Sequence, residues 1–184
     1  MVNVIRLSVI TVVFGLCYFE AAAQGNGTTR EQRRQEWQRF SAQLQVFKKQ
    51  AREAFADEMA REKAGDCPHA TTTYDINMCL GDEVQKTTKN YQDYVYALRG
   101  IEALENPGEP EPVGPTGKPP TAEERAKEFD AVEATWKDFY DKQCAAAYHA
   151  YQGGTIAPSM DLMSRLRLMR DRMRELEAVY DIEH

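Results

Sequence analysis

The sequence has little of the chemistry on which enzymes depend. Its 184 residues contain no HExxH, GxSxG, GxGxxG or CxxC pattern and no phosphate-binding P-loop. His69, His149 and His184 are the only imidazoles available as general bases, and none stands in a recognisable catalytic arrangement. Carboxylates are plentiful, but they fall on charged helix faces, where a solvated surface is the ordinary role. We therefore expect a protein that is not an enzyme and that holds neither a metal nor a cofactor.

Long hydrophobic runs are also missing, apart from one near the start of the chain. The apolar run of residues 7–19 is shorter than the roughly 20 residues that a spanning helix needs. Arg6 precedes this run and Ala21–Ala23 follow it, which is the pattern of a signal peptide with its cleavage site. We expect residues 1–23 to be removed and the mature protein to be exported, either to a periplasm or to the outside.

Cysteine is scarce in the expected mature chain, which has only Cys67, Cys79 and Cys144. In an oxidising compartment an odd number predicts one disulfide and one thiol that is free or intermolecular. Two pairings are open. Cys67 can bond to Cys79 and so fix the segment before a helix to the first turns of that helix. Alternatively, Cys79 can bond to Cys144 across two antiparallel helices. A zinc site that also used His69 and His149 is less favoured, because a disulfide is the ordinary state of cysteines in an exported protein.

Basic residues are fewer than acidic residues over most of the chain. The sequence carries 23 Lys and Arg against 29 Asp and Glu, a net charge of −6. Residues 28–65 hold nine basic and six acidic side chains, whereas residues 66–184 hold thirteen basic and twenty-two acidic ones. An acidic body argues against nucleic acid as a partner and is compatible with a basic protein.

No segment alternates apolar and polar residues as a β-strand does. The apolar residues recur instead every three or four positions, which predicts long amphipathic helices. We expect helices over residues 28–64, 72–104, 121–150 and 158–180, joined as an all-α four-helix bundle of antiparallel helices around one core. Six of the eight prolines fall between the second and third helix, so we expect a proline-rich loop over residues 105–120.

The first expected helix has a narrow apolar stripe, nearly that of a coiled coil. It can pack on the body of the protein or pair with a partner helix, and we favour packing within the chain. We divide the mature sequence into an N-terminal amphipathic helix, residues 24–65, and a helical domain, residues 66–184. The stripe consists of Trp37, Phe40, Leu44, Phe47, Ala51, Phe55 and Met59.

The bundle is expected to be organised around the third helix. Its start has the capping-box sequence Thr121-Ala-Glu-Glu124, in which the two end side chains satisfy backbone N–H groups. The spacing predicts one continuous buried face, made of Phe129, Val132, Trp136, Phe139, Tyr140, Cys144 and Ala147.

The fourth expected helix carries many arginines beside its apolar stripe. We expect these arginines to form a solvated face, balanced in part by acidic neighbours. They are Arg165, Arg167, Arg170, Arg172 and Arg174.

Four short motifs follow one another at characteristic spacings. They are two cysteines twelve residues apart, a tryptophan eight residues before a third cysteine, a Gly-Gly turn, and a closing L-x3-R-x2-E-L-x3-Y. Over about residues 66–180 the chain resembles the lysozyme inhibitor LprI-like family in these motifs. The matching residues are Cys67, Ala70, Thr72, Asn77 and Cys79; Trp136, Phe139, Asp141 and Cys144; Gly153, Gly154 and Ile156; and Leu168, Arg172, Glu175, Leu176 and Tyr180.

The resemblance implies a small exported helical domain, with the motif residues in structural roles. The family's usual Arg before the Asp is Tyr140 here, and a fourth cysteine expected near Met163 is missing. If that cysteine is the partner of Cys144, the remaining bridge joins Cys67 to Cys79, and the resemblance leads us to prefer this pairing.

Two functions remain open at this point. The resemblance implies a binding protein of the cell envelope whose partner is a lysozyme-type muramidase, with the acidic body meeting a basic enzyme cleft. The alternative is a structural or assembly protein that uses its N-terminal helix for oligomerisation or for docking a partner.

Overall fold

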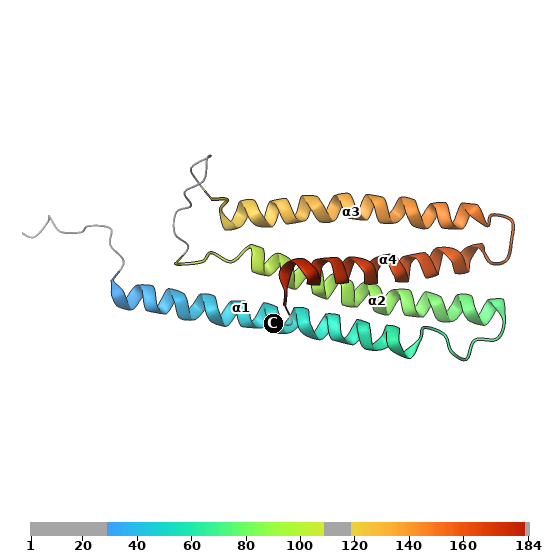
Figure 1. Ribbon diagram of the computed structural model, residues 1–184, viewed down its shortest axis with the longest axis horizontal. Helices are drawn as coiled ribbons and strands as arrows, with labels where there is room; N and C mark the ends of the chain where they lie inside the picture. The colour runs from blue at the N-terminus through green and yellow to red at the C-terminus, as the bar shows by residue number, and fades with distance from the viewer. Residues whose placement is uncertain (1–28, 109–118, 183–184) are drawn as a thin grey trace, which may run out of the picture.

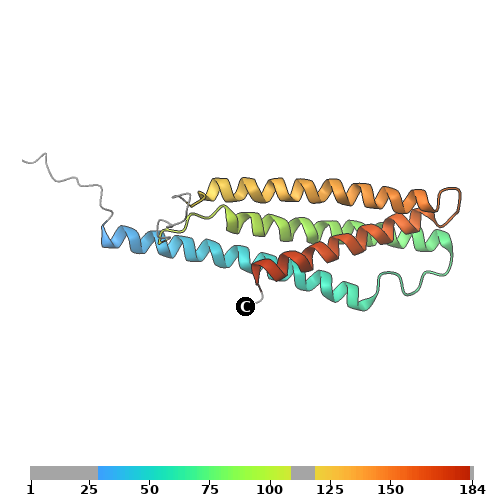
Figure 2. The ribbon, with the colours of Figure 1, turned by 45° about the horizontal axis from the view of Figure 1, so that its top comes forward.

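A computed structural model describes residues 29–108 and 119–182 (Figure 1). Consecutive helices run antiparallel and lie side by side (Figures 1 and 2). The described residues contain no strand, which confirms the all-α bundle. The expected signal peptide and most of the proline-rich loop lie outside the described residues. The helices are α1 (Arg30–Ala64), α2 (Thr73–Glu102), α3 (Ala122–Ala150) and α4 (Ala157–Tyr180).

Three of the four helices begin at a threonine cap. The side chains of Thr29, Thr72 and Thr121 each accept a hydrogen bond from a backbone N–H in the first turn of α1, α2 and α3. The backbone N–H of Thr121 donates to Glu124 at 2.7 Å, and that of Glu124 donates to the Thr121 hydroxyl at 3.2 Å. This is the capping box that the sequence predicts. A second capping box joins Thr29 to Gln32.

Helices α2 and α4 each contact all three other helices, and α2 packs most extensively on α1 and α4. The sequence-based expectation that α3 organises the bundle is therefore wrong. Helix α3 contacts only α2 and α4 within the described residues, so it lies at an edge. Tyr94 and Leu98 of α2 are fully buried, and they pack with Ala51 of α1, Met173 of α4 and Ile182 in the core.

The edge position of α3 explains why its apolar stripe is only partly buried. Phe129, Tyr140 and Cys144 are buried as predicted, whereas Val132 is 51% exposed and Phe139 48% exposed. A helix that packs on its neighbours along one side needs a narrower stripe than the sequence carries. The prediction of one continuous buried face is therefore wrong for these two residues.

Helix α1 packs within the chain, as the sequence favours. Its C-terminal half supplies Ala51, Ala54 and Glu58 to the buried interior. Its N-terminal half extends past the ends of the other three helices (Figures 1 and 2). None of the helices in the described ranges has a stretch apolar and long enough to cross a bilayer.

Candidate functional site

The candidate site lies at the end of the bundle that carries the disulfide. We call this part of the molecule the disulfide end and define it as residues 66–81 and 143–163. It joins the connection from α1 to α2, the start of α2, the turn from α3 to α4, and the start of α4. Both connections lie at the same end of the bundle, on the right in Figure 1.

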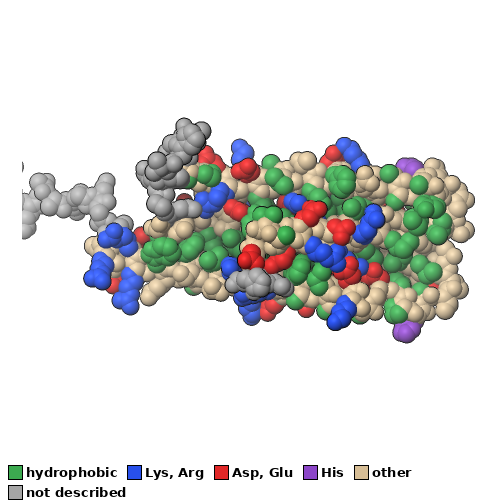
Figure 3. Space-filling view, viewed as in Figure 1, with side chains coloured by type: hydrophobic (Ala, Val, Ile, Leu, Met, Phe, Trp, Pro, Cys, Tyr) green, Lys and Arg blue, Asp and Glu red, His purple; other side chains and the backbone are tan. Residues whose placement is uncertain are grey.

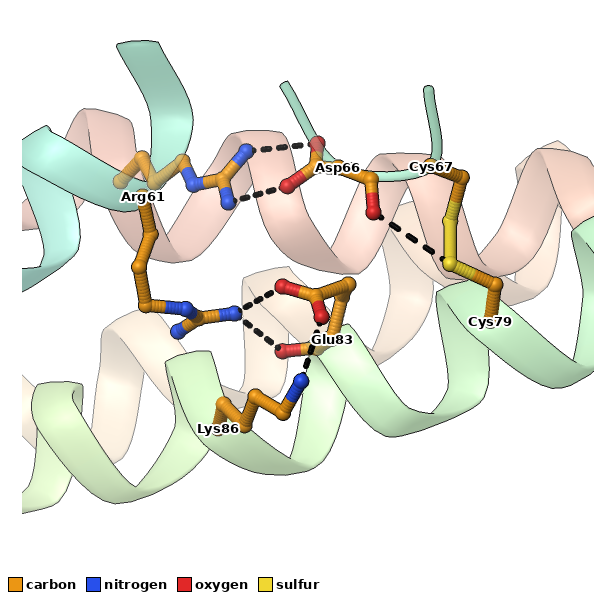
Figure 4. The surroundings of a disulfide bond; sticks show 7 residues. Arg61, Asp66, Cys67, Cys79, Glu83 and Lys86 are labelled. Carbon is orange, nitrogen blue, oxygen red and sulfur yellow. Dashed lines mark hydrogen bonds and ion pairs between the residues drawn. A yellow bond between two sulfur atoms is a disulfide. The ribbon is translucent and has the colours of Figure 1, made fainter. Parts of the chain in front are cut away.

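A disulfide joins Cys67 to Cys79, with 6.1 Å between their Cα atoms. It ties the α1–α2 connection to the second turn of α2 (Figure 4). Cys144 of α3 is a buried free thiol. The pairing implied by the family resemblance is therefore confirmed, and the Cys79–Cys144 alternative is wrong. The disulfide also rules out the zinc site, because neither of these two cysteines is available as a thiolate ligand.

The residue before Cys67 is held by an arginine from α4. Arg170 donates from both terminal nitrogens to the carboxylate of Asp66, at 2.8 and 2.5 Å. The backbone oxygen of Asp66 lies 3.3 Å from the Cys79 sulfur. The sequence analysis places Arg170 on a solvated face, and this is wrong, because Arg170 is only 3% exposed. Arg170 is on the face of α4 that packs toward α1, where Glu58 and Asp66 cover its side chain, although the neighbouring Asp171 stays exposed.

The charge of Arg170 is shared with Glu58 of α1, which is completely buried. Glu58 accepts hydrogen bonds from Arg170 Nε at 2.7 Å, from Arg61 at 2.7 Å, from the Thr87 hydroxyl at 2.7 Å and from Asn90 at 3.0 Å. A buried carboxylate is tolerated only when donors of this kind replace water. This network fixes α1, α2 and α4 to one another behind the disulfide.

Arg61 extends the same network to the surface of α2. It pairs with Glu83, which also accepts from Lys86 at 2.7 Å (Figure 4). Burial opposes ionisation of Glu83, but hydrogen bonds from Lys86 and Arg61 hold its pKa below the usual value.

The sequence analysis missed Glu58 as a buried residue. A signal for it was present, since Glu58 follows Ala51 by seven positions and Ala54 by four. This spacing continues the a and d pattern of the α1 stripe, so a carboxylate there must have buried partners.

The starts of α2 and α4 are joined by a hydrogen bond between two polar side chains. The Ser159 hydroxyl donates to Oδ1 of Asn77 at 2.6 Å, and Ser159 is 3% exposed. In the preceding turn Gly153 has a φ of +89°, a backbone conformation that favours glycine. The motif residues Gly153 and Gly154 thus form the turn that places Ser159 within hydrogen-bond distance of Asn77.

A row of aromatic rings runs from α2 across α3 toward α4. The Tyr91 and Trp136 ring centroids are 5.0 Å apart, and Trp136 stacks on Tyr140 at 5.2 Å. The guanidinium of Arg165 lies 5.6 Å from the centroid of Tyr140, within the range of a cation–π contact. Cys144 and Tyr140 share one cluster, and burial raises the pKa of the Cys144 thiol to about 11.

The closing motif on α4 lies further from the disulfide. Arg172 donates to Glu133 of α3, and the Tyr91 hydroxyl donates to the same carboxylate at 2.5 Å. Burial and Glu133 raise the pKa of Tyr91. Leu176 is buried in the main core, and Tyr180 packs edge to face on Phe129.

The structure therefore divides the predicted motif residues into two groups. At the disulfide end are Cys67, Ala70, Thr72, Asn77, Cys79, Cys144, Gly153 and Gly154. Trp136 stands in the aromatic row, while Arg172, Leu176 and Tyr180 hold α4 in the bundle. Phe139 and Asp141 point to the outer side of α3, where Asp141 accepts from Lys137 at 2.8 Å.

The surface of the disulfide end is poor in charge and rich in exposed apolar side chains. Residues 143–160 contain no Asp, Glu, Lys or Arg, and residues 67–81 contain only Asp75. In Figure 3 hydrophobic atoms gather at this end of the visible face, while the acidic and basic colours lie mostly elsewhere. The exposed apolar residues of the disulfide end are Tyr74, Met78, Tyr148, Tyr151, Ile156 and Met163.

This composition is typical of the centre of a protein–protein interface. Such centres are depleted in charge and enriched in Tyr and Met. Their backbone is commonly the same in the free and the bound protein. The disulfide, the Arg170 network and the Asn77–Ser159 bond fix the backbone beneath this surface. The arrangement can therefore present a rigid apolar surface to a partner protein.

The comparisons with known proteins found a family match that includes these residues. A family model described as lysozyme inhibitor LprI matches residues 64–176, which is more than half of the chain. The match begins at the last residue of α1, so the rest of α1 lies outside it. No curated protein and no solved structure matches the chain.

Proposed function

Because the chain belongs to the lysozyme inhibitor LprI family, we propose that it is an exported, non-enzymatic protein that binds a lysozyme-type muramidase and blocks it. The observation that carries this proposal is the family match over residues 64–176. That segment contains the whole disulfide end, so the family relationship and the candidate surface cover the same part of the molecule.

Export is supported by the chemistry of the disulfide end. Disulfides persist in oxidising compartments, and the Cys67–Cys79 bond is present here. The predicted signal peptide of residues 1–23 would direct the chain to such a compartment.

We place the contact with the muramidase on the exposed side chains of the disulfide end. Tyr148 is 40% exposed and Tyr151 45% exposed, at the last turn of α3 and just beyond it. Tyrosine is one of the residue types that most often dominate binding energy, because it buries a large ring at a low entropic cost. Met78 and Met163 supply adaptable apolar surface on the neighbouring helices.

Inhibition of a chicken-type lysozyme in a cell-wall clearing assay tests the proposal. The mature chain from Gln24 should inhibit stoichiometrically at micromolar concentration. Replacing Tyr148 and Tyr151 together with Ala should weaken inhibition at least tenfold, because each interface tyrosine contributes more than about 1 kcal/mol.

A matched control uses tyrosine far from the disulfide end. Tyr96 is 65% exposed in the C-terminal part of α2, and Tyr96→Ala should leave inhibition within about twofold of the wild type. An equal loss of inhibition in both variants would mean that the contact with the muramidase is not at the disulfide end. A well-folded wild-type chain that does not inhibit would overturn the function itself.

A further inference from the structure

The first part of α1, residues 30–52, has an excess of positive charge that the other described residues leave largely without ion pairs. Residues 30–52 hold seven Lys and Arg against two Glu. Among them only Lys49 makes an ion pair with a described side chain, namely Glu53 at 3.6 Å. The six others are exposed or half-buried without an ion pair to any described residue. They are Arg30, Arg33, Arg34, Arg39, Lys48 and Arg52.

Most arginines of α4 differ in this respect. Arg165, Arg170, Arg172 and Arg174 each pair with at least one carboxylate, whereas Arg167 makes no ion pair with a described residue. Cations without an ion pair are therefore concentrated in residues 30–52 of α1, where they remain available to a partner of opposite charge.

Four of the unpaired cations lie on one side of α1. Arg30, Arg34, Lys48 and Arg52 are separated by steps of four and fourteen residues, which bring side chains back to nearly the same helix face. The four span about 33 Å of helix at 1.5 Å per residue. The row begins on the part of α1 that extends past the other helices (Figures 1 and 2) and continues along the bundle, where Lys48 and Arg52 lie on either side of the buried Ala51 in the sequence.

An exposed indole lies beside the basic row. Trp37 follows Arg30 by seven residues and Arg34 by three, and it is 42% exposed. Its ring packs edge to face on Phe40 and lies against Gly108, so the ring is oriented and only partly exposed. Trp beside a row of Lys and Arg is the composition of a helix that lies in the headgroup region of a bilayer, where indole is favoured.

We propose that the basic row of α1, within residues 30–52, binds the surface of a membrane that contains anionic phospholipid. A cationic row along one helix face suits an extended anionic plane, because all four side chains of the row can reach phosphate groups at once. The pockets beside this part of α1 are lined by other residues of the helix, such as Gln43 and Phe47, and not by the four residues of the row. The binding is peripheral, and it uses a part of the chain outside the family match.

Vesicle sedimentation tests the proposal with the full mature chain. Vesicles of phosphatidylcholine with phosphatidylglycerol should carry the protein into the pellet at low salt, and vesicles of phosphatidylcholine alone should not. In a Trp136→Phe background, in which Trp37 is the only Trp, the anionic vesicles should shift the emission to shorter wavelength. Added salt should release the protein, since screening weakens the attraction.

Two quadruple variants distinguish the effect of the basic row on vesicle binding from the effect of net charge. Replacing Arg30, Arg34, Lys48 and Arg52 with Gln should lower the vesicle partition coefficient at least a hundredfold, on the basis of about fivefold per basic residue. The matched control replaces four exposed lysines of α2 and α3 with Gln. This variant should change the vesicle partition coefficient by less than about threefold. The control lysines are Lys89, Lys127, Lys137 and Lys142.

The proposal has two clear contrary outcomes. If both quadruple variants lose vesicle binding equally, net charge rather than the α1 row is responsible. If the wild-type chain stays in the supernatant with anionic vesicles but is retained by immobilised polyglutamate, the occupant is an acidic protein and the membrane proposal is wrong. Circular dichroism of the two quadruple variants should show unchanged helix, because their substituted residues lie outside the core, and the Trp136→Phe background keeps an aromatic ring at that position.

Discussion

Arg170 of α4 donates from Nε to Glu58 of α1 at 2.7 Å, in a part of the bundle where both side chains are almost completely removed from solvent. Two ions are stable in such a place only because each has further partners. Arg170 also binds Asp66, and Glu58 accepts from Arg61, Thr87 and Asn90. The pair thus links the first and last helices to the residue beside the disulfide.

Replacing Glu58 with Gln should lower the free energy of unfolding by about 3–5 kcal/mol. The substitution leaves the buried Arg170 with one carboxylate and points amide hydrogens at donor groups, and breaking a buried ion pair commonly costs this much. Urea denaturation of the variant and the wild type measures the difference.

An exposed ion pair is the control for Glu58. Asp141 accepts from Lys137 at 2.8 Å, with side chains more than half exposed, so Asp141→Asn should change the free energy of unfolding by less than about 1 kcal/mol. A Glu58→Gln variant as stable as Asp141→Asn would show that the buried network does not hold the bundle together.

Reduction of the Cys67–Cys79 disulfide should destabilise the protein by about 3 kcal/mol. The bond closes a loop with a sequence separation of 12, and cross-linking a loop of this size removes about that much entropy from the unfolded chain. The α1–α2 connection should also hold Asp66 less firmly on Arg170.

Thermal or urea unfolding with and without a phosphine reductant measures the effect of the disulfide. The double variant Cys67→Ser and Cys79→Ser is the matched control, since the reductant should shift the wild type and leave this variant unchanged. An identical midpoint for the wild type in both conditions would contradict the prediction.

Helix positions and caps could be predicted from the sequence because they depend on neighbours along the chain. The capping box formed by Thr121 and Glu124 is one example, since these two residues are three positions apart. The exposure of Val132 and Phe139 could not be predicted in this way. It depends on α3 having no contact with α1, which is a property of the assembled bundle.

The same distinction explains the error at Arg170. Its neighbours Asp171 and Arg172 suggest a solvated face, but its partners Asp66 and Glu58 are more than a hundred residues away. The exposed surface of the disulfide end was also missed, although the absence of charge over residues 143–160 was visible in the sequence. Only the fold places that stretch beside the charge-poor start of α2.

The buried thiol of Cys144 should react slowly with a disulfide reagent in the native protein. Burial raises its pKa to about 11, so only about one thiol in a thousand is ionised at pH 8, and the sulfur is fully covered. Unfolding in urea should speed the reaction by at least about a hundredfold. A native rate equal to the unfolded rate would contradict the buried position.

The raised pKa of Cys144 also predicts a pH dependence of stability. Between the unfolded pKa of about 8.5 and the folded value of about 11, the folded state binds more protons than the unfolded state. Stability should therefore fall as the pH rises through this window. In Cys144→Ala this contribution should be missing, so the variant should lose less stability than the wild type between pH 8 and 11.

Salt should act on the association rate with a basic muramidase more than on the dissociation rate. The chain carries a net charge of −6, which attracts a basic enzyme from a distance, but the proposed contact surface over residues 143–160 contains no charged side chain. Surface plasmon resonance at increasing ionic strength should show association slowing at least tenfold while dissociation changes less than about twofold. Dissociation that accelerates with salt as strongly as association slows would place the contact on the charged faces of α3 and α4 instead.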